Sequence, residues 1–296
     1  MKVLITGVAG FIGSHTAEKF LAEGHTVIGV DDLSTGSNHN IPEGVDFKWL
    51  DITIQDDVDK MFDEEFDAVV HLAAQPSLLE SRKYPDVDAQ INIIGTINLL
   101  KKIGLKRFVF SSTSAVYSSQ DTAEDSTLLF PNTPYGASKL SAERYVKLLA
   151  PEGVALRYGN VYGPRQVPLG ENQLVPRVLD HVYKGEEFVV NGDGLQTRDF
   201  VYVKDVANAN YAAVTQELPN DFCFNVSSGI SYSVIDVVKE IARLTAFTGE
   251  LEHGPKKAGE RVKVSMPNDL MTQSFDWIPE FTLHTGLKET VLAYNG

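Results

Sequence analysis

The chain has 296 residues and a formal net charge of −14, and this acidic balance argues against nucleic acid and anionic membranes as partners, because both require a basic face. Its single cysteine, Cys223, excludes an intramolecular disulfide and a cysteine-based metal cluster, so no metal site is predicted. No apolar run approaches the ~20 residues that cross a bilayer, and the first residues do not resemble a signal peptide, so we expect a cytoplasmic protein.

The first half of the chain alternates predicted strands and helices. A short apolar run at 2–6 predicts a buried parallel strand, and residues 11–23 predict a helix that stops at Gly24. Further strands are predicted at 26–30, 47–50, 68–71, 107–111 and 154–157, and a helix at 134–149. Strands separated by helices form right-handed βαβ units, which predict an α/β fold with a doubly wound parallel Rossmann sheet.

The pattern changes after about residue 165. Predicted helices at 173–184, 206–216 and 234–245 then alternate with short strands, and more Gly and Pro lie between them. We therefore expect a first domain at 1–164 and a smaller C-terminal α/β domain at 165–296, with some segments of the second returning to the first.

A glycine-rich turn joins the first strand to the first helix. Gly7, Gly10 and Gly13 allow a tight turn, a close approach of the backbone to a pyrophosphate, and close packing of the helix on the sheet. The first helical residues, Phe11 and Ile12, then present free backbone N–H groups to the phosphates. This arrangement predicts a dinucleotide-binding site in the first domain.

Two acidic residues, Asp31 and Asp32, end the second predicted strand. Asp31 lies 18 residues after Gly13, close to the spacing of the carboxylate that binds the adenosine ribose. A carboxylate at this place would repel a 2′-phosphate. The predicted cofactor is therefore NAD rather than NADP.

Residues that follow the third and fourth strands lie where the cofactor would cross the sheet edge. Asp51 and Ile52 would border the adenine, although Asp51 is equally interpreted as the N-cap of a helix over 53–61. Leu72, Ala73 and Ala74 follow the fourth strand, and the two alanines leave room for a cofactor.

Tyr135 and Lys139 are four residues apart on a predicted helix, so both side chains lie on one face. A free tyrosine titrates near ~10, and a nearby ammonium with a cationic nicotinamide ring can lower that pKa toward neutrality. Hydroxyl residues at 111–114 follow the fifth strand, at the edge where open α/β sheets bind ligands. We expect one of them to bridge the reacting oxygen to Tyr135 and the others to cap turns.

Together these motifs resemble the extended short-chain dehydrogenase/reductase family, in its NAD-dependent epimerase/dehydratase group, and most of all its UDP-glucose 4-epimerase branch. The resemblance runs almost end to end. Besides the glycine loop, its motifs are residues 71–75 (HLAAQ), 92–96 (NIIGT), 111–113 (SST), 135–139 (YGASK), 156–165 (LRYGNVYGPR) and 192–201 (GDGLQTRDFV).

The resemblance implies roles for individual residues. Thr113 takes the place of the catalytic Ser/Thr, Tyr135 that of the acid/base, and Lys139 that of its partner. For the substrate it implies Thr113, Asn160 and Arg198 at the sugar and diphosphate, Val175 at the uracil, and Lys257 and Glu260 at phosphate and ribose. The residues expected to contact NAD are Gly7, Gly10, Phe11, Ile12, Gly13, Asp31, Asp32, Asp51, Ile52, Leu72, Ala73, Ala74, Asn92, Ser111, Tyr135, Lys139 and Tyr158.

The chain departs from the family pattern at position 257, where lysine replaces arginine. Lysine pairs with phosphate but lacks the bidentate fork, so either Lys257 or the nearby Arg261 is expected to meet the diphosphate. Dehydratase relatives carry an Asp-Glu pair where this chain has Ser114 and Ala115, which cannot move a proton at a sugar carbon. The resemblance therefore implies epimerisation and argues against elimination of water.

The predicted reaction is reversible epimerisation at C4 of a UDP-hexose, UDP-glucose or UDP-galactose, through a transient 4-keto sugar with tightly bound NAD. Val264, smaller than the tyrosine of strict glucose enzymes, extends the prediction to N-acetylated sugars. The open alternatives are a uronate or CDP-sugar epimerase, a net NAD-dependent oxidoreductase, and a non-catalytic NAD-binding regulator. Family members commonly pair through the helices near 92–101 and 135–149, which implies a homodimer.

Overall fold

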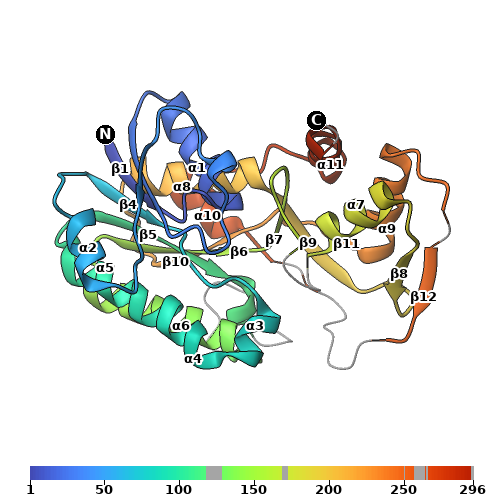
Figure 1. The fold of residues 1–296 in the computed structure, drawn as a ribbon, viewed down its shortest axis with the longest axis horizontal. Coiled ribbons are helices and arrows are strands. Elements are labelled where there is room, and N and C mark those ends of the chain that lie inside the picture. Colours follow the sequence, from blue (N-terminus) through green and yellow to red (C-terminus); the bar gives the residue numbers. More distant parts are fainter. Residues whose placement is uncertain (118–128, 169–172, 250, 257–263, 265, 295–296) are drawn as a thin grey trace.

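The computed structural model describes residues 1–117, 129–168, 173–249, 251–256, 264 and 266–294, arranged as two lobes (Figure 1). The larger lobe is built on a seven-stranded parallel sheet of order β10-β6-β5-β4-β1-β2-β3. Its strands are β1 (Lys2–Thr6), β2 (Thr26–Asp31), β3 (Asp46–Trp49), β4 (Ala68–His71), β5 (Arg107–Thr113), β6 (Gly153–Tyr158) and β10 (Cys223–Val226). The strand order changes direction between β1 and β4, because β2 and β3 are added on one side of β1 and β4, β5 and β6 on the other. Open parallel sheets bind ligands at such a point.

Helices cover both faces of this sheet (Figure 1). One face carries α1 (Phe11–Ala22), α8 (Val203–Thr215) and α10 (Asp269–Phe275). The other carries α2 (Gln55–Met61), α5 (Thr96–Ile103) and α6 (Pro134–Leu149), with α3 (Leu78–Lys83), α4 (Pro85–Ala89) and the π-helical segment η2 (Gln90–Gly95) beyond them. Val3 and Ile5 of β1 enter one buried core and Leu4 the other, because successive strand residues face opposite sides. The predicted doubly wound α/β fold is confirmed.

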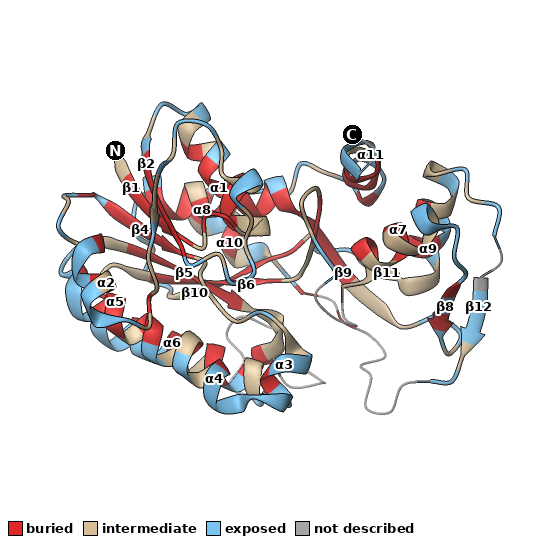
Figure 2. Ribbon diagram, viewed as in Figure 1, coloured by how far each residue is buried: buried red, intermediate tan, exposed pale blue. Residues whose placement is uncertain are grey.

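In the part of the chain that the structure describes, the smaller lobe has two short sheets and three helices. A three-stranded sheet contains β11 (Ser231–Ser233), β9 (Thr197–Tyr202) and β7 (Asn160–Tyr162), and a two-stranded sheet pairs β12 (Leu251–Gly254) with β8 (Phe188–Asn191). The helices are α7 (Leu174–Lys184), α9 (Val234–Leu244) and α11 (Leu283–Tyr294). Figure 2 shows that the buried residues of this lobe gather on β9, α7 and neighbouring elements, which form a core of their own.

Two later segments of the chain belong to the larger lobe. β10 pairs with β6 at the edge of the main sheet, and α8 packs against α1. Trp277, after α10, is buried in the core of the same lobe, and its Nε1 donates to the Asp205 carbonyl oxygen at 3.0 Å. The chain therefore crosses between the lobes more than once.

Some predicted boundaries agree with the structure, and others differ from it. β4 and α6 have the predicted bounds, whereas β5 extends two residues further and includes Ser112 and Thr113. The helix predicted over 53–61 begins at Gln55 with Ile54 as its N-cap, so the interpretation of Asp51 as the cap is wrong. Asp51 instead accepts the Thr53 N–H at 2.7 Å in a turn before the helix. None of the described helices is long and apolar enough to cross a membrane.

Candidate active site

The glycine turn after β1 is packed too closely to accept side chains. Gly7 has φ +74°, and a Cβ there would lie 2.7 Å from the Ala73 nitrogen. A Cβ on Gly13 would overlap the carbonyl oxygen of Gly7, so α1 rests directly on the turn. Gly10, the N-cap of α1, has no side chain to bond the first-turn N–H groups of Phe11 and Ile12. The positive end of α1 is therefore left to a phosphate-bearing ligand.

Asp31 ends β2 beside the glycine turn. Its carboxylate accepts the Ala9 N–H at 3.0 Å and the Leu33 N–H at 2.8 Å. Burial raises the pKa of Asp31, while these two hydrogen bonds act in the opposite direction. A carboxylate has about four acceptor sites, so Asp31 is fixed in place with acceptors to spare for ribose hydroxyls.

The neighbouring Asp32 is exposed and turns away from the core. Its carboxylate accepts the backbone N–H of Ser34 at 2.9 Å and the hydroxyl of the same residue at 2.6 Å. Its carbonyl oxygen accepts Nε1 of the exposed Trp49 at 2.9 Å. Asp32 therefore shapes the loop after β2.

The loop after β4, residues 72–77, is held from two sides. The Ala73 N–H donates to the Thr6 hydroxyl at 3.2 Å. Asn92 bonds the backbone of Gln75 in both directions, accepting at 2.9 Å and donating at 3.2 Å. Asn92 lies in the π-helical segment η2, a rare geometry that often occurs at functional sites. The side-chain amide of Asn92 thus positions this loop, which contains Leu72 and Ala74 and would border a cofactor.

His71, at the end of β4, is buried between two hydroxyl groups. Its ring nitrogens lie 2.7 Å from the Thr6 hydroxyl and 2.9 Å from the Thr96 hydroxyl. Burial and then the charge of Lys139 lower the pKa of His71 to about 3, so the ring is neutral. Ile52, buried against Gly95, completes the packing on this side.

The three predicted catalytic residues lie at the end of β5 and in the first turns of α6. Thr133 caps α6 by accepting the Gly136 N–H at 3.1 Å, and this cap places Tyr135 in the first helical turn. Burial raises the pKa of Tyr135 to about 12, against the effect of its hydrogen bond with Thr113. The structure therefore joins the predicted base to the predicted hydroxyl.

Lys139 lies one turn further along α6 and is 2% exposed. Its ammonium lies 3.5 Å from the Ser111 hydroxyl and 4.2 Å from the centre of the Phe110 ring. Burial lowers the pKa of Lys139 to about 7, although the negative charges of Glu143 and Asp88 oppose this shift. The three hydroxyl residues at the end of β5 thus have different neighbours, because Ser111 meets Lys139, Thr113 meets Tyr135, and Ser112 donates to Glu143.

The sequence analysis missed a buried ion pair behind this site. Arg157 of β6 donates to both carboxylate oxygens of Glu143 at 2.9 and 2.8 Å, and both side chains are almost fully buried. Arg157 also donates to the Tyr117 hydroxyl at 3.0 Å, which donates to Asn225 at 2.7 Å. Glu143 shares its helix face with Tyr135 and Lys139. The sequence did carry one signal of this pair, because Arg157 lies within an otherwise apolar strand.

Three of the predicted substrate residues, Asn160, Val175 and Arg198, lie in the smaller lobe, whereas Thr113 ends β5 of the larger one. Asn160 and Val175 line one cavity of about 130 Å³, together with Tyr162 and Phe200. The Asn160 amide donates to the Asp199 carbonyl oxygen at 3.1 Å. Arg198 is half-buried on β9, which pairs with β7. Lys257 and Glu260, and the alternative Arg261, lie outside the described residues.

Tyr158 uses its hydroxyl within the fold. That hydroxyl donates to the Asn210 amide oxygen of α8 at 2.7 Å, and burial raises the pKa of the phenol. Any contact of Tyr158 with NAD is therefore left to the ring.

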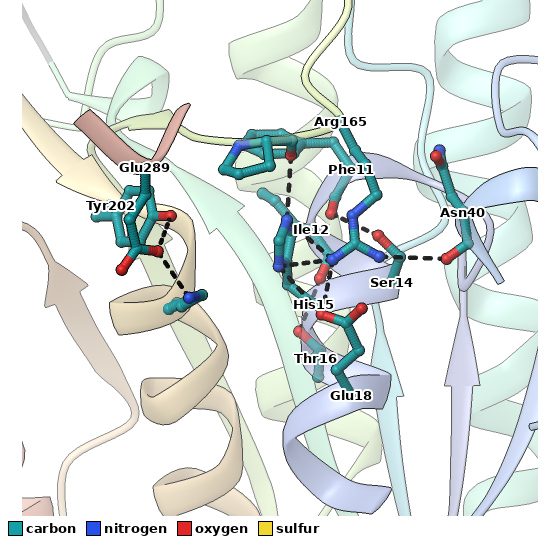
Figure 3. Close-up of polar contacts among 12 residues, drawn as sticks. Phe11, Ile12, Ser14, His15, Thr16, Glu18, Asn40, Arg165, Tyr202 and Glu289 are labelled. Atoms are coloured by element: carbon teal, nitrogen blue, oxygen red, sulfur yellow. Dashed lines mark hydrogen bonds and ion pairs between the residues drawn. The ribbon is translucent and has the colours of Figure 1, made fainter. Parts of the chain in front are cut away.

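Arg165 connects the start of the smaller lobe to α1 (Figure 3). With φ +67°, it directs its guanidinium to His15 Nδ1 at 2.8 Å, Glu18 at 2.6 Å and the Asn40 carbonyl oxygen at 3.4 Å. Burial acts to raise the pKa of Glu18, but hydrogen bonds from His15 and Arg165 outweigh it and lower that pKa to about 2. This cluster ties the glycine-loop helix and the loop after β2 to the second lobe.

Comparisons with known proteins agree with this geometry. The profile of the NAD dependent epimerase/dehydratase family matches residues 3–226. A putative UDP-glucose 4-epimerase of Methanocaldococcus jannaschii is 36% identical over 299 residues, covering 98% of this chain and 97% of the relative. The chain belongs to the NAD-dependent epimerase/dehydratase family. The family resemblance predicted from the motifs is confirmed.

Two solved structures of this family superpose over the whole chain. The UDP-glucose 4-epimerase of Thermotoga maritima, solved with UDP-glucose, has a TM-score of 0.93 and 36% identity, and 100% of this chain and 99% of that one are covered. The UDP-glucose 4-epimerase of Thermus thermophilus, solved as a complex with NAD, has a TM-score of 0.92 and 34% identity, with the same coverage. NAD as the cofactor, predicted from the glycine turn and Asp31, is thereby confirmed.

Proposed function

We propose that this protein interconverts the C4 epimers of a UDP-hexose, UDP-glucose and UDP-galactose, through a transient 4-keto sugar with NAD retained throughout. The hydrogen bond of Tyr135 with Thr113, and Lys139 one turn further along α6 beside Ser111, carry this proposal. The family's similar structures with UDP-glucose and with NAD support it.

Tyr135 is the acid/base of the proposed reaction. As a phenolate it takes the proton of the C4 hydroxyl, and as a phenol it returns that proton, while the Thr113 hydroxyl orients the reacting oxygen. Bound NAD would supply the acceptor and donor for the hydride of C4. Burial alone keeps Tyr135 protonated, so the phenolate depends on positive charge beside it, which protonated Lys139 and the nicotinamide ring supply.

The turn after Thr113 supports epimerisation over elimination. Ser114 and Ala115 form a 3₁₀ turn, and the Ala115 N–H donates to the Thr113 hydroxyl at 3.2 Å. Neither side chain can act as a general acid or base near neutral pH. Both half-reactions then use the same tyrosine, and no NAD is consumed.

The remaining assignments extend this proposal to binding. The domain predicted at 1–164 holds NAD, at the seventeen positions named above, except for β7, which belongs to the smaller lobe. The domain predicted at 165–296 holds the nucleotide sugar, except for α8, β10 and α10 on the main sheet. Asn160, Val175 and Arg198 are proposed for the uridine diphosphate, and Lys257 and Glu260 stay predictions. Acceptance of N-acetylated sugars also stays a prediction, which draws support from the small Val264 beside Val116 and Tyr117.

Purified protein given UDP-galactose tests the proposal. We expect UDP-glucose to form without added NAD or with catalytic NAD. Tyr135→Phe should lower kcat by about 10²–10⁴-fold while the NAD content stays unchanged. Failure to interconvert any UDP-hexose pair, including the N-acetylated and uronate forms, would overturn it, and stoichiometric release of NADH would favour a net oxidoreductase.

We also propose a homodimer formed through α6 and the segment before α5. Ile94, Tyr145 and Leu148 are 41%, 40% and 78% exposed on these helices, an apolar surface that a second copy would cover. Sedimentation of the wild type and of Leu148→Glu tests this proposal. We expect the wild type to sediment as a dimer and the variant as a monomer. A monomeric wild type contradicts the proposal. The cytoplasmic location stays a prediction.

A further inference from the structure

Asp88 is a buried carboxylate that the proposed reaction leaves unexplained. It lies near the end of α4, one turn before Asn92, and is 1% exposed. Its Oδ1 accepts Gln75 Nε2 at 2.9 Å and Asn92 Nδ2 at 3.1 Å. Within the described part of the chain, its Oδ2 is buried without a hydrogen-bond partner. The donors to Asp88, these two amides and the Ser138 hydroxyl, are all neutral, so none cancels the charge of the carboxylate.

Helix α6 brings the catalytic pair to this carboxylate. The Asn92 amide that donates to Asp88 also lies 3.1 Å from the Ser138 hydroxyl, and Ser138 precedes Lys139. Burial raises the pKa of Asp88, whereas hydrogen bonds from Ser138 and Gln75 and the charge of Lys139 act in the opposite direction. The charge of Asp88 in turn acts to raise the pKa of both Lys139 and Tyr135. The charged residues of α3, Glu80, Arg82 and Lys83, are exposed, and η2 carries none.

Glu143 is the other carboxylate near Lys139, but its charge is already paired. Arg157 bonds it through two N–H groups, which neutralises the pair locally. The remaining charged and titratable neighbours of Lys139 on other elements are the neutral His71 of β4 and Asp88 of α4. Asp88 therefore carries the uncompensated negative charge of this buried region, as far as the described residues extend.

We propose, resting on the function proposed above, that Asp88 is the buried counter-charge that keeps Lys139 protonated beside Tyr135. It touches neither substrate nor cofactor and acts through Lys139, so it is a positioning residue. Burial disfavours the ammonium, and an unpaired negative charge nearby restores it. The hydrogen bonds from Gln75 and Asn92 fix the carboxylate and link it to the loop that borders the cofactor.

The charge predicts a specific signature in the pH dependence. A negative charge raises the pKa of an ammonium and of a phenol alike. Removing it lowers both. In the NAD-bound protein, where the nicotinamide charge opposes the effect of burial on Tyr135, the acidic and alkaline limbs set by the coupled Tyr135–Lys139 pair therefore move together to lower pH. A loss of packing would instead lower the height of the profile without moving its limbs.

The test uses the NAD-bound protein with the charge removed in an isosteric variant, Asp88→Asn. We expect both limbs of kcat against pH to shift downward by about 0.5–1 unit, so that the ratio of variant to wild-type rate changes about 3–10-fold at each limb. Asp86→Asn, an exposed carboxylate on the same helix, is the matched control and should leave the profile in place. Asp88→Glu keeps the charge and should keep the positions of the limbs even if its rate is lower.

An absorbance titration of the tyrosinate, with Tyr135→Phe subtracted, follows the ionisation of Tyr135 without turnover. It should show a lower Tyr135 pKa in Asp88→Asn than in the wild type. Limbs that stay in place in Asp88→Asn, or that move equally in Asp88→Glu, overturn the proposal. An inactive wild type would count against the proposed function alone, because the absorbance titration still tests Asp88.

Discussion

Asp31 in the larger lobe and Asn160 in the smaller one are both polar residues expected to hold a ligand, but the fold prepares them differently. Asp31 is 8% exposed and fixed by two backbone N–H groups, next to a glycine turn that no side chain could enter. Asn160 is half-buried, donates to the Asp199 carbonyl oxygen, and borders a cavity. A site fixed in advance suits a cofactor that stays, and a more open one suits a nucleotide sugar that must enter and leave.

Two arginines sharpen this contrast. Arg157 of the larger lobe is 3% exposed and satisfies a buried carboxylate. Arg198 of the smaller lobe is half-buried on a strand beside the cavity and is proposed to meet the diphosphate. Replacing the first should therefore damage the fold, and replacing the second should damage substrate binding.

The largest effect is expected from Arg157→Leu. It leaves the Glu143 carboxylate buried and unpaired, which should lower the free energy of unfolding by about 3–5 kcal/mol. Urea denaturation measures the loss. The double variant Glu143→Leu/Arg157→Leu should recover much of it, and a single variant as stable as the wild type would contradict the role assigned to the pair.

Gly13→Ala should come next. The added Cβ overlaps the Gly7 carbonyl oxygen, so α1 or the turn must move, at a cost near the upper end of overpacking, about 3 kcal/mol. The protein should also be purified with little NAD. Gly24→Ala is the control, because its Cβ would meet open space and only its left-handed backbone conformation is unfavourable. This control should retain NAD. Full NAD content in Gly13→Ala would show that the turn is not the phosphate site.

Arg198→Met should raise the KM for UDP-glucose by about 10–100-fold, the loss of one charge-assisted hydrogen bond worth ~1.5–3 kcal/mol. Because Arg198 is half-buried and donates to the Thr197 carbonyl oxygen at 2.8 Å, its replacement should also lower the free energy of unfolding, but by less than Arg157→Leu does. Arg243→Met, exposed on α9, controls for loss of a positive charge. An unchanged KM would remove Arg198 from the diphosphate site.

The smallest effect concerns the contact between the lobes. Glu18 has a folded-state pKa lowered from 4.5 to about 2, so its contribution to stability is present above about pH 4.5 and lost as the pH falls toward 2. Because Glu18 is 47% exposed, solvent screening limits this contribution to less than about 1 kcal/mol. Glu18→Gln should be slightly less stable than the wild type at about pH 6, and the difference should shrink at about pH 3. A difference independent of pH would contradict an ionic role.

The sequence predicted those elements and site residues that local residue patterns determine. Apolar runs and glycine turns placed β4, α6 and the glycine loop, and the spacing of Tyr135 and Lys139 predicted their common face. Asp51 was misjudged as a cap because two further residues, Thr53 and Ile54, precede the helix. Asp88 was missed because its partners come from separate elements, and no pattern around position 88 marks it. Arg165 reaches a histidine 150 residues away, a pairing that only the folded chain reveals.

The placement of the chain's two tryptophans provides a pair of intrinsic optical probes. Trp49 is 73% exposed and bonded to the loop at Asp32, beside the proposed adenosine site, whereas Trp277 is 4% exposed in the core. A collisional quencher should therefore reduce the fluorescence of Trp49 and leave that of Trp277 almost unchanged. The fluorescence of one sample can then report cofactor binding through Trp49 and global unfolding through Trp277.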